Sequence, residues 1–206
     1  MALWSLVLYA LYLTLAFGGR ALLQLRRTGS TGFVGIAGHR GSVEWTAGIL
    51  FVAASVLVPA TPVLDLAGVL EPIAALEGSM GHALGFLLFC AGLVGTLLAQ
   101  VWMGASWRVG VDEEEKTELV VRGPFALVRN PIFSAMVPAI LGLALLVPNA
   151  AAVAGFAALV CALELQVRFV EEPYLLRKHG TDYAAYASRV GRFVPGIGLS
   201  RDGGAR

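Results

Sequence analysis

The segment Leu119–Phe133, LVVRGPFALVRNPIF, runs directly into the apolar segment Ser134–Val147, SAMVPAILGLALLV. Two arginines and an asparagine crowd the boundary between them: Arg122, Arg129 and Asn130. Asparagine is a favoured N-cap and proline is favoured at the first helical position, so the Asn-Pro pair predicts a helix start. A helix N-terminus offers free N–H groups and a positive dipole end. Together with two arginines, it is suited to hold a carboxylate or a phosphate.

The composition places the chain among membrane proteins. Of its 206 residues, 57% are hydrophobic and 14% are charged, and the mean hydropathy is +0.76, which departs far from soluble averages. The length fits one membrane-embedded domain, residues 1–206. A net charge of +1 gives no support for a nucleic-acid partner. We expect no metal either, because the acidic run Asp112–Glu115 is better explained as a solvated turn and the histidines lack a ligand spacing.

Five apolar segments predict an all-α integral membrane bundle, because about twenty apolar residues cross a hydrocarbon core roughly 30 Å thick. The expected transmembrane helices are Leu3–Leu25, Val43–Val58 with some extension, Gly81–Met103, Pro131–Val147 and Ala150–Val170. The sequence VPATP at Val58–Pro62 is expected to end the second helix, since proline removes a donor and restricts its predecessor. The sequence VPN at Val147–Asn149 predicts a tight hairpin between the last two helices.

The basic residues fall on one side of these helices. The loops Arg26–Ser42 and Gly104–Asn130 carry lysine and arginine, whereas the loop Pro59–Met80 carries only acidic charges. The positive-inside rule therefore predicts a multi-pass protein of the cell membrane, with the N-terminus outside and the C-terminus in the cytoplasm.

The fifth helix ends in a stripe of charges. Glu164, Arg168, Glu171 and Glu172 follow i, i+4, i+7, i+8 spacing, which predicts that they share one face. Ionisable groups inside a membrane usually face the bundle interior or a water-filled cavity. The alternative is a pair of i, i+4 ion pairs, Glu164 with Arg168 and Arg168 with Glu172, each stabilising the helix by about 0.2–0.5 kcal/mol.

Aromatic residues mark two further elements. Trp102 and Trp107 fit an interfacial aromatic belt. Tyr183, Tyr186 and Val190 follow i, i+3, i+7 spacing, which predicts a short, cytoplasmic C-terminal amphipathic helix that lies on the membrane or caps the bundle.

Two motifs resemble the integral-membrane methyltransferases of the isoprenylcysteine carboxyl methyltransferase type, which are similar to phospholipid methyltransferases. The segment GPFALVRNPIF is similar to that family's Gly-Pro-Tyr…Arg-His-Pro-x-Tyr segment. The segment EEPYLLRKHGTDYAAYASRVGRFVP is similar to its Glu-Glu-x-x-Leu…Gly-x-x-Tyr-x-x-Tyr…Pro ending, and MGASWR is similar to bacterial members. The resemblance covers roughly Gln100 to Pro195.

The resemblance implies a binding pocket for S-adenosylmethionine near the cytoplasmic interface. Its residues would be Gly123, Phe125, Val128, Arg129, Asn130, Phe133, Glu171 and Glu172. Glu171 or Glu172 would bind the ammonium group of the cofactor, and the helix that begins at Pro131 would receive its carboxylate. Asn130 stands where the family often has histidine and Phe133 where it often has tyrosine, so altered contacts are expected at a retained site.

The resemblance implies an S-adenosylmethionine-dependent methyltransferase. In-line methyl transfer from a sulfonium needs no metal and is accelerated by positioning and by exclusion of water. Arg129 and Arg189 are candidates for orienting the acceptor, since arginine can bind a carboxylate bidentately. We expect a lipophilic acceptor that arrives sideways from the surrounding membrane lipids, and a prenylated carboxylate is the sharpest expectation that the resemblance provides.

Two other functions remain open. In a small transporter or channel subunit, Glu164, Arg168 and Glu171 would line an ion path, but the outer halves of the five segments carry almost no polar side chains. A noncatalytic membrane protein that binds the cofactor is the second alternative, and the departures at Asn130 and Phe133 motivate it.

Overall fold

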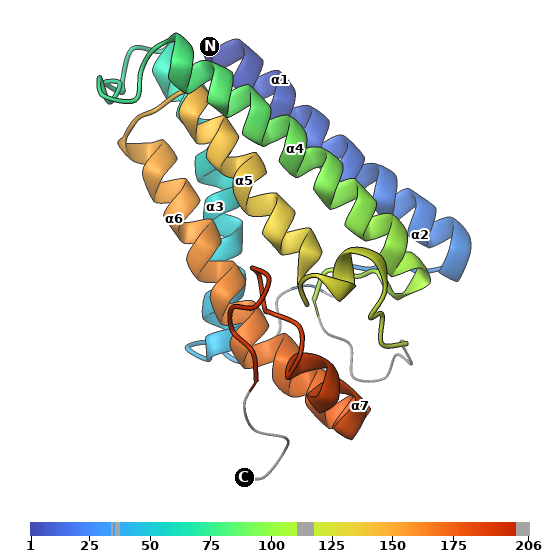
Figure 1. Ribbon diagram of the computed structural model, residues 1–206. Coiled ribbons are helices and arrows are strands. Elements are labelled where there is room, and N and C mark those ends of the chain that lie inside the picture. The colour runs from blue at the N-terminus through green and yellow to red at the C-terminus, as the bar shows by residue number, and fades with distance from the viewer. Residues whose placement is uncertain (34, 36–37, 111–117, 201–206) are drawn as a thin grey trace.

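The computed structural model describes residues 1–33, 35, 38–110 and 118–200. Over these residues the chain is helical and its only β-structure consists of isolated bridges. The acidic run Asp112–Glu115 lies outside the described residues. The helices form an elongated bundle with the N-terminus at one end and α7 at the other (Figure 1).

The long helices form five rods, and the first and the last of them change helix type along their length. The first rod consists of α1 (Ala2–Tyr12), the π-helix η1 (Leu13–Gly19) and α2 (Arg20–Thr28). It is followed by α3 (Val43–Leu66), α4 (Ser79–Met103) and α5 (Pro131–Leu146). The last rod consists of α6 (Ala150–Leu165), the π-helix η4 (Gln166–Glu171) and α7 (Glu172–Ala187). Two short 3₁₀ helices, η2 (Gly104–Ser106) and η3 (Gly123–Ala126), precede α5.

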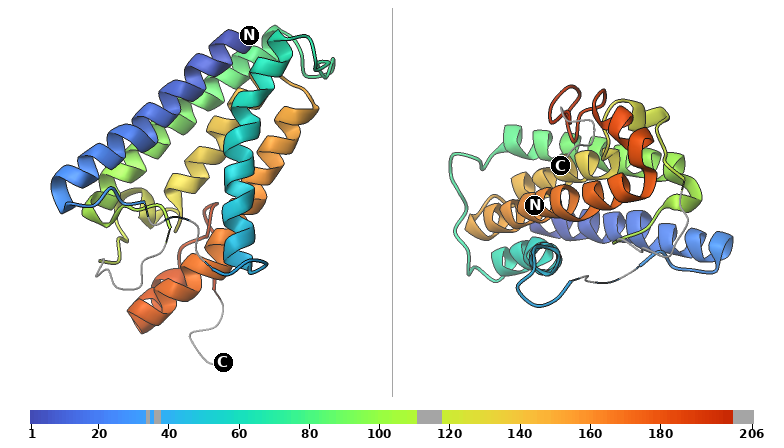
Figure 2. Two further views of the ribbon diagram at one scale, coloured as in Figure 1. Left: turned by 180° about the vertical axis from the view of Figure 1, so that it is seen from behind. Right: turned by 90° about the horizontal axis from the view of Figure 1, so that it is seen from below.

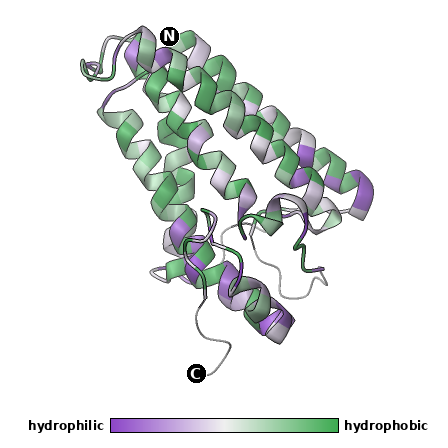
Figure 3. Ribbon diagram, in the orientation of Figure 1, coloured by the Kyte–Doolittle hydropathy of each residue, from purple (hydrophilic) through white to green (hydrophobic). Residues whose placement is uncertain are grey.

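The chain is a membrane protein. Four helical stretches are long and apolar enough to cross a bilayer, and they are Ala2–Thr28, Val43–Leu66, Ser79–Ser106 and Ala150–Ala187. Their shafts are mostly hydrophobic, whereas hydrophilic residues gather near α2 and α7 (Figure 3). The helix α5 has 16 residues and is about 24 Å long, shorter than the hydrocarbon core. The fifth span therefore stays a prediction.

The predicted end of the second span at VPATP is wrong, because α3 continues through Pro59 and Pro62 to Leu66. A proline inside a helix deprives the carbonyl four residues earlier of its donor. For Pro59 this carbonyl belongs to Ser55, and the Tyr9 hydroxyl of α1 donates to it at 2.8 Å. A neighbouring helix thus satisfies the backbone group that the proline frees, which is how membrane helices tolerate proline.

The last helical rod continues past the predicted end of the span at Val170, to Ala187, and where the membrane-embedded part ends stays a prediction. Its only non-helical residue is Gly180, with φ 51° and ψ −124°. Beyond this kink, Tyr183 and Tyr186 are buried and pack against Leu119 and other apolar residues. Both tyrosines therefore lie on the last part of α7, which ends at Ala187, before Val190. A cytoplasmic amphipathic helix stays a prediction.

Glycines bring α4 and α5 into close contact. A Cβ at Gly92 would lie 2.5 Å from the Ala139 nitrogen, and a Cβ at Gly85 would lie 2.8 Å from the Gly142 oxygen. Small residues at such positions allow membrane helices to approach closely. The helix α3 packs against α6 on the other side of the bundle (Figure 1), and the space between these two pairs contains the site described below.

The predicted aromatic belt is wrong at Trp107, which is 2% exposed, and stays a prediction at Trp102, which is 53% exposed. Trp107 lies under the guanidinium of Arg20, 5.0 Å from the ring centroid. Arg20 also donates to the Gly104 carbonyl, and Gln24 donates to the Ala105 carbonyl at 2.6 Å. The first rod therefore holds the turn that follows α4 and keeps Trp107 inside the bundle.

Candidate functional site

A cavity of about 410 Å³ lies where α3, α5, η4 and α7 meet the turn after α4. Its volume falls within the range of small-molecule sites, and we call it the polar chamber. Its charged and amide-bearing lining residues are Glu44, Gln100, Arg108, Glu118, Arg129, Asn130, Gln166 and Glu171. Its aromatic lining includes Phe125, Phe133, Tyr174, Tyr183 and Tyr186. Such a mixture of charged and aromatic groups suits a ligand that carries both charge and flat rings.

A second cavity of about 210 Å³, the apolar slot, adjoins the polar chamber. The two cavities share Phe17, Phe33, Phe51, Val109 and Met136 as wall residues. The hydroxyl groups in the wall of the slot are satisfied elsewhere: that of Tyr9 donates to the Ser55 carbonyl at 2.8 Å, and that of Tyr12 lies 3.0 Å from the Thr96 hydroxyl. The slot therefore presents an apolar surface, and it suits a hydrocarbon group.

The start of α5 faces the polar chamber. The helix begins at Pro131 with Asn130 as its N-cap, which confirms the predicted helix start. The Asn130 side chain makes no capping hydrogen bond, and its Nδ2 donates to the Arg192 carbonyl at 3.2 Å. The N–H groups of Ile132 and Phe133 belong to the first turn, which has no intrahelical acceptor for them. Both residues line the chamber, so this helix end can receive an anionic group.

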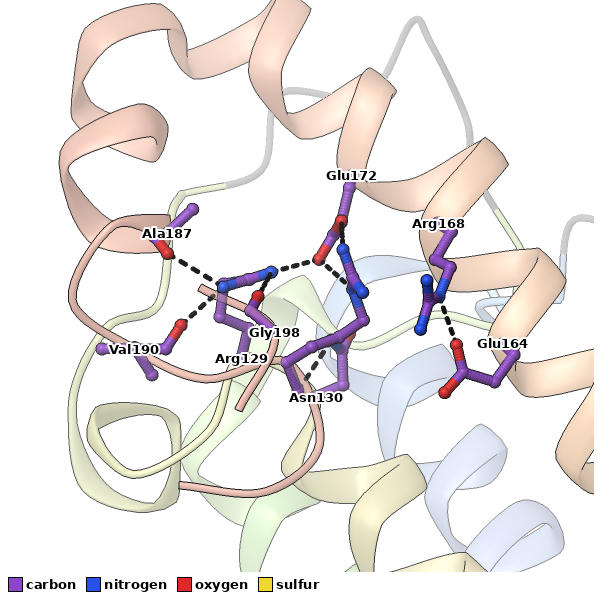
Figure 4. Close-up of polar contacts among 9 residues, drawn as sticks. Arg129, Asn130, Glu164, Arg168, Glu172, Ala187, Val190 and Gly198 are labelled. Carbon is purple, nitrogen blue, oxygen red and sulfur yellow. Dashed lines mark hydrogen bonds and ion pairs between the residues drawn. The ribbon is translucent and has the colours of Figure 1, made fainter. Parts of the chain in front are cut away.

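Arg129 connects the start of α5 to the C-terminal segment (Figure 4). One of its terminal nitrogens donates to the Ala187 and Val190 carbonyls at 3.0 and 2.5 Å. The other donates to the Gly198 carbonyl at 3.0 Å and to the Glu172 carboxylate at 2.5 Å. The Arg129 side chain is only 2% exposed. These contacts hold the segment that follows α7 against the base of α5.

Glu172 serves the same junction. Besides Arg129, it accepts two hydrogen bonds from Arg192, at 2.8 and 2.7 Å, and this contact raises the pKa of Arg192. Backbone hydrogen bonds join the same two segments: the Arg129 nitrogen donates to the Gly191 carbonyl at 2.8 Å, and the Asn130 nitrogen donates to the Arg192 carbonyl at 3.1 Å. Both oxygens of the Glu172 carboxylate therefore accept hydrogen bonds from arginines.

Glu171 occupies a different environment from its neighbour. It lines the polar chamber, with Gln166 within hydrogen-bonding distance and Arg108 among the nearby charges. It closes the π-helix η4, and π-turns inside α-helices are frequent at functional sites. The predicted pair of Glu164 with Arg168 is present on a half-exposed surface. The predicted pair of Arg168 with Glu172 is wrong, because among the described residues Glu172 pairs with Arg129 and Arg192.

The structure brings together five of the predicted site residues. Those that line the chamber are Phe125, Arg129, Asn130, Phe133 and Glu171. Three others do not line the chamber but contact residues next to it. A Cβ at Gly123 would collide with the Trp102 ring, and Val128 forms an isolated bridge with Gly191. Glu172 pairs with Arg129. Arg189 lies apart, because it is exposed and its Nε donates to the Ala185 carbonyl at 3.0 Å.

Sequence reasoning missed several residues in the chamber wall. Gln100 and Gln166 are polar residues within apolar helices, and this is the signal that could have identified them. Gln100 also donates to the Ala16 carbonyl at 2.7 Å. Tyr183 contributes a buried hydroxyl that lies close to the buried guanidinium of Arg129. Within residues 1–33, 35, 38–110 and 118–200, no group of three or more histidine, cysteine or acidic residues could hold a metal ion.

Comparison with known proteins bears on this arrangement. Residues 80–182, half of the chain, match the family described as phospholipid methyltransferase. This family belongs to the isoprenylcysteine carboxyl methyltransferase-like group of membrane methyltransferases, which confirms the resemblance of the two motifs. The nickel-cobalt-cadmium resistance protein NccN of Alcaligenes xylosoxydans xylosoxydans is 29% identical over 115 residues, 55% of this chain and 53% of that protein. The chain thus spans about half the length of this curated relative. No solved structure matches this chain.

Proposed function

Since the chain belongs to the phospholipid methyltransferase family, a family of membrane methyltransferases, we propose that it transfers the methyl group of S-adenosylmethionine to a lipophilic acceptor. The observation that carries this proposal is the two-part cavity, in which a polar chamber adjoins an apolar slot. A charged cofactor fits the chamber and a hydrocarbon chain fits the slot. The reacting groups would then meet where the two cavities share their walls.

The residues of the chamber fit S-adenosylmethionine. Of the two carboxylates predicted for its ammonium group, Glu171 lines the chamber, whereas Glu172 is held by two arginines. The first-turn N–H groups of Ile132 and Phe133 suit its carboxylate. The rings of Phe125 and Phe133 in the wall suit stacking against adenine. When bound, this cofactor supplies an electrophilic methyl group on a positively charged sulfur.

The protein itself would contribute positioning and exclusion of water. Holding the acceptor in line with the methyl group supplies the proximity on which such a transfer depends. A carboxylate acceptor would yield an ester with no proton to remove, whereas an amine acceptor would have to lose one. The apolar slot supports a long hydrocarbon group on the acceptor, and a prenylated carboxylate is one compound of this class.

Arg129 would act as a positioning residue. Its terminal nitrogens are engaged with the C-terminal carbonyls and Glu172, its side chain is 2% exposed, and the residue lines the chamber. We propose that Arg129 holds the C-terminal segment in place and thereby fixes the wall of the chamber. Arg189, predicted to orient the acceptor, would have to leave the Ala185 carbonyl to do so.

We propose that the chamber faces the cytoplasm, where S-adenosylmethionine is made available in solution. Two observations support this orientation. All fifteen lysines and arginines fall on one side of the predicted spans, and the N-terminus lies at the end of the bundle opposite α7 (Figure 1). The N-terminus would then be outside the cell.

Titration calorimetry of the purified protein with S-adenosylmethionine and its demethylated product tests the proposal. Glu171→Gln should weaken binding of both by about 1.5–3 kcal/mol, the contribution of a charge-assisted hydrogen bond. The matched control is Glu164→Gln, which removes a half-exposed carboxylate outside the chamber and should leave binding unchanged. Transfer of a radiolabelled methyl group to a membrane lipid extract would complete the assignment. Failure of the wild-type protein to bind either compound would refute it.

A further inference from the structure

The side chain of Phe33 occupies the junction of the two cavities. It lines both the polar chamber and the apolar slot. It belongs to the connection between α2 and α3, outside the family match at residues 80–182. The ring is 50% exposed, although it borders a cavity that extends into the bundle. An exposed aromatic ring at this junction requires an explanation that the family does not supply.

Phe33 is held in place by its neighbours. The Val109 nitrogen donates to the Gly32 carbonyl at 2.7 Å, and Phe33 and Val109 form an isolated parallel bridge. The Phe33 ring stacks on Phe17 with centroids 6.5 Å apart and meets Trp107 edge-on at 6.1 Å. The position of the Phe33 side chain is therefore fixed both by the backbone bridge and by contacts with two aromatic rings.

On this side the cavity lies between the first rod and α3. The helices α2 and α3 diverge toward the end of the bundle that carries α7 (Figure 2). Cavity-lining residues of both rods face this region: Phe17 of η1, and Ala47, Phe51 and Val52 of α3. On the opposite side, α4 and α5 are packed closely through their glycines, which leaves no comparable space.

We propose that Phe33 controls the access of the acceptor's hydrocarbon chain from the bilayer to the apolar slot and thereby determines how bulky a chain the protein accepts. The proposal rests on the proposed function, because it assumes a lipophilic acceptor that occupies the slot. A chain entering between η1 and α3 passes the edge of the Phe33 ring before it reaches Met136, which lines both cavities and is 4% exposed. A smaller residue at position 33 widens this passage and a larger one narrows it.

Thiol labelling tests this access without any need for methyl transfer. Cys90 and Cys161, both exposed, are replaced by alanine, and Met136→Cys places a reporter thiol in the slot. The protein is reconstituted in phosphatidylcholine–phosphatidylglycerol vesicles. The probes are a dodecyl maleimide dissolved in the bilayer and a sulfonated maleimide confined to water. Ile140→Cys, at a second residue that lines the slot, serves as the reporter where Met136→Cys does not fold.

Phe33→Ala should raise the labelling rate by the dodecyl maleimide roughly tenfold, the factor expected from losing two aromatic contacts. Phe33→Trp should lower it. The matched control is Phe169→Ala, which removes an equally exposed ring (53%) that lines neither cavity and should leave the rate unchanged. Equal rates in Phe33→Ala and Phe169→Ala would overturn the proposal. An equal acceleration of the sulfonated probe would do the same, because it would mean access from water.

The outcome is separable from that of the proposed function. If S-adenosylmethionine does not bind while labelling responds to position 33, the methyltransferase assignment fails and the access route stands. If the cofactor binds and labelling does not respond, only the access route fails.

Discussion

Replacing Arg129 by methionine tests how the C-terminal segment is held against α5. Methionine keeps much of the side-chain volume but removes every donor. The Ala187, Val190 and Gly198 carbonyls would lose a charged partner, and Glu172 would keep only Arg192. The consequence should be local opening of the segment that follows α7 rather than loss of the bundle.

The size of the effect follows from burial. Losing one partner of a buried ion pair costs about 3–5 kcal/mol, and each hydrogen bond from a charged donor contributes about 1.5–3 kcal/mol. Glu172 is 17% exposed and retains Arg192, so the lower end of the first range, about 3 kcal/mol, applies to the ion pair, and the three lost carbonyl hydrogen bonds add to it. Since each 1.4 kcal/mol is a factor of ten, the opening equilibrium should shift at least roughly a hundredfold toward the open state.

Hydrogen exchange measured by mass spectrometry on the detergent-solubilised protein reads this shift directly. The amides of Arg192 and Ser200, which donate to the Ile197 and Ala187 carbonyls at 2.8 and 3.0 Å, should exchange at least roughly a hundredfold faster in Arg129→Met. The control Arg168→Met breaks the half-exposed pair with Glu164, which contributes at most about 1 kcal/mol, and should leave both amides protected.

Wild-type protection of these amides in Arg129→Met would refute the positioning role. If the same variant then lost methyl transfer at unchanged cofactor affinity, Arg129 would act on the acceptor directly, as the sequence alone suggested. The two roles are thus distinguished by a structural and a kinetic measurement on one protein.

Three further predictions concern the bundle. Tyr9→Phe should destabilise the wild-type protein more than it destabilises Pro59→Ala, because alanine restores a backbone donor for the Ser55 carbonyl. The coupling energy between the two substitutions, measured by denaturation of all four proteins, should be about 0.6–1.7 kcal/mol. A coupling energy of zero would mean that the Tyr9 hydroxyl does not compensate for Pro59. Gly92→Leu should overpack α4 against α5 and cost about 1–3 kcal/mol in the same assay, while Gly18→Ala, whose Cβ would meet its nearest neighbour at an ordinary 3.8 Å, should not. A single cysteine at Arg27 should react with an impermeant maleimide only after cells are permeabilised, and labelling of intact cells would reverse the proposed orientation.

Hydropathy was sufficient to predict the helical membrane architecture but not the helix ends. Long apolar segments must form helices in a bilayer, whatever they pack against, so four spans follow from composition. The extension of α3 beyond Pro59 could not be predicted in the same way. It depends on the hydroxyl of Tyr9, which donates to the Ser55 carbonyl 46 residues away. The sequence near Pro59 does not indicate that such a donor will be present.

The candidate site shows the same division. Phe125, Asn130 and Phe133 line the chamber, and it was the resemblance of the motif around the Asn-Pro helix start that implied their place in a pocket. The choice between Glu171 and Glu172 was beyond the sequence, since the two are adjacent and identical in type. It is decided by Arg129, 43 residues from Glu172, and by the C-terminal segment that both residues hold.

The division of the chain suggests how one family can act on different acceptors. Glu171 and the first turn of α5, the groups proposed to bind the cofactor, lie within residues 80–182, where the family match falls. Most residues that line the apolar slot instead precede residue 80, among them Tyr12, Phe17 and Phe51. A change in those helices would alter the space for a hydrocarbon chain without moving the groups proposed to bind the methyl donor. Under the proposed function, the acceptor preference should therefore reside in the first two helical rods, and the chemistry in the segment that the chain shares with the family.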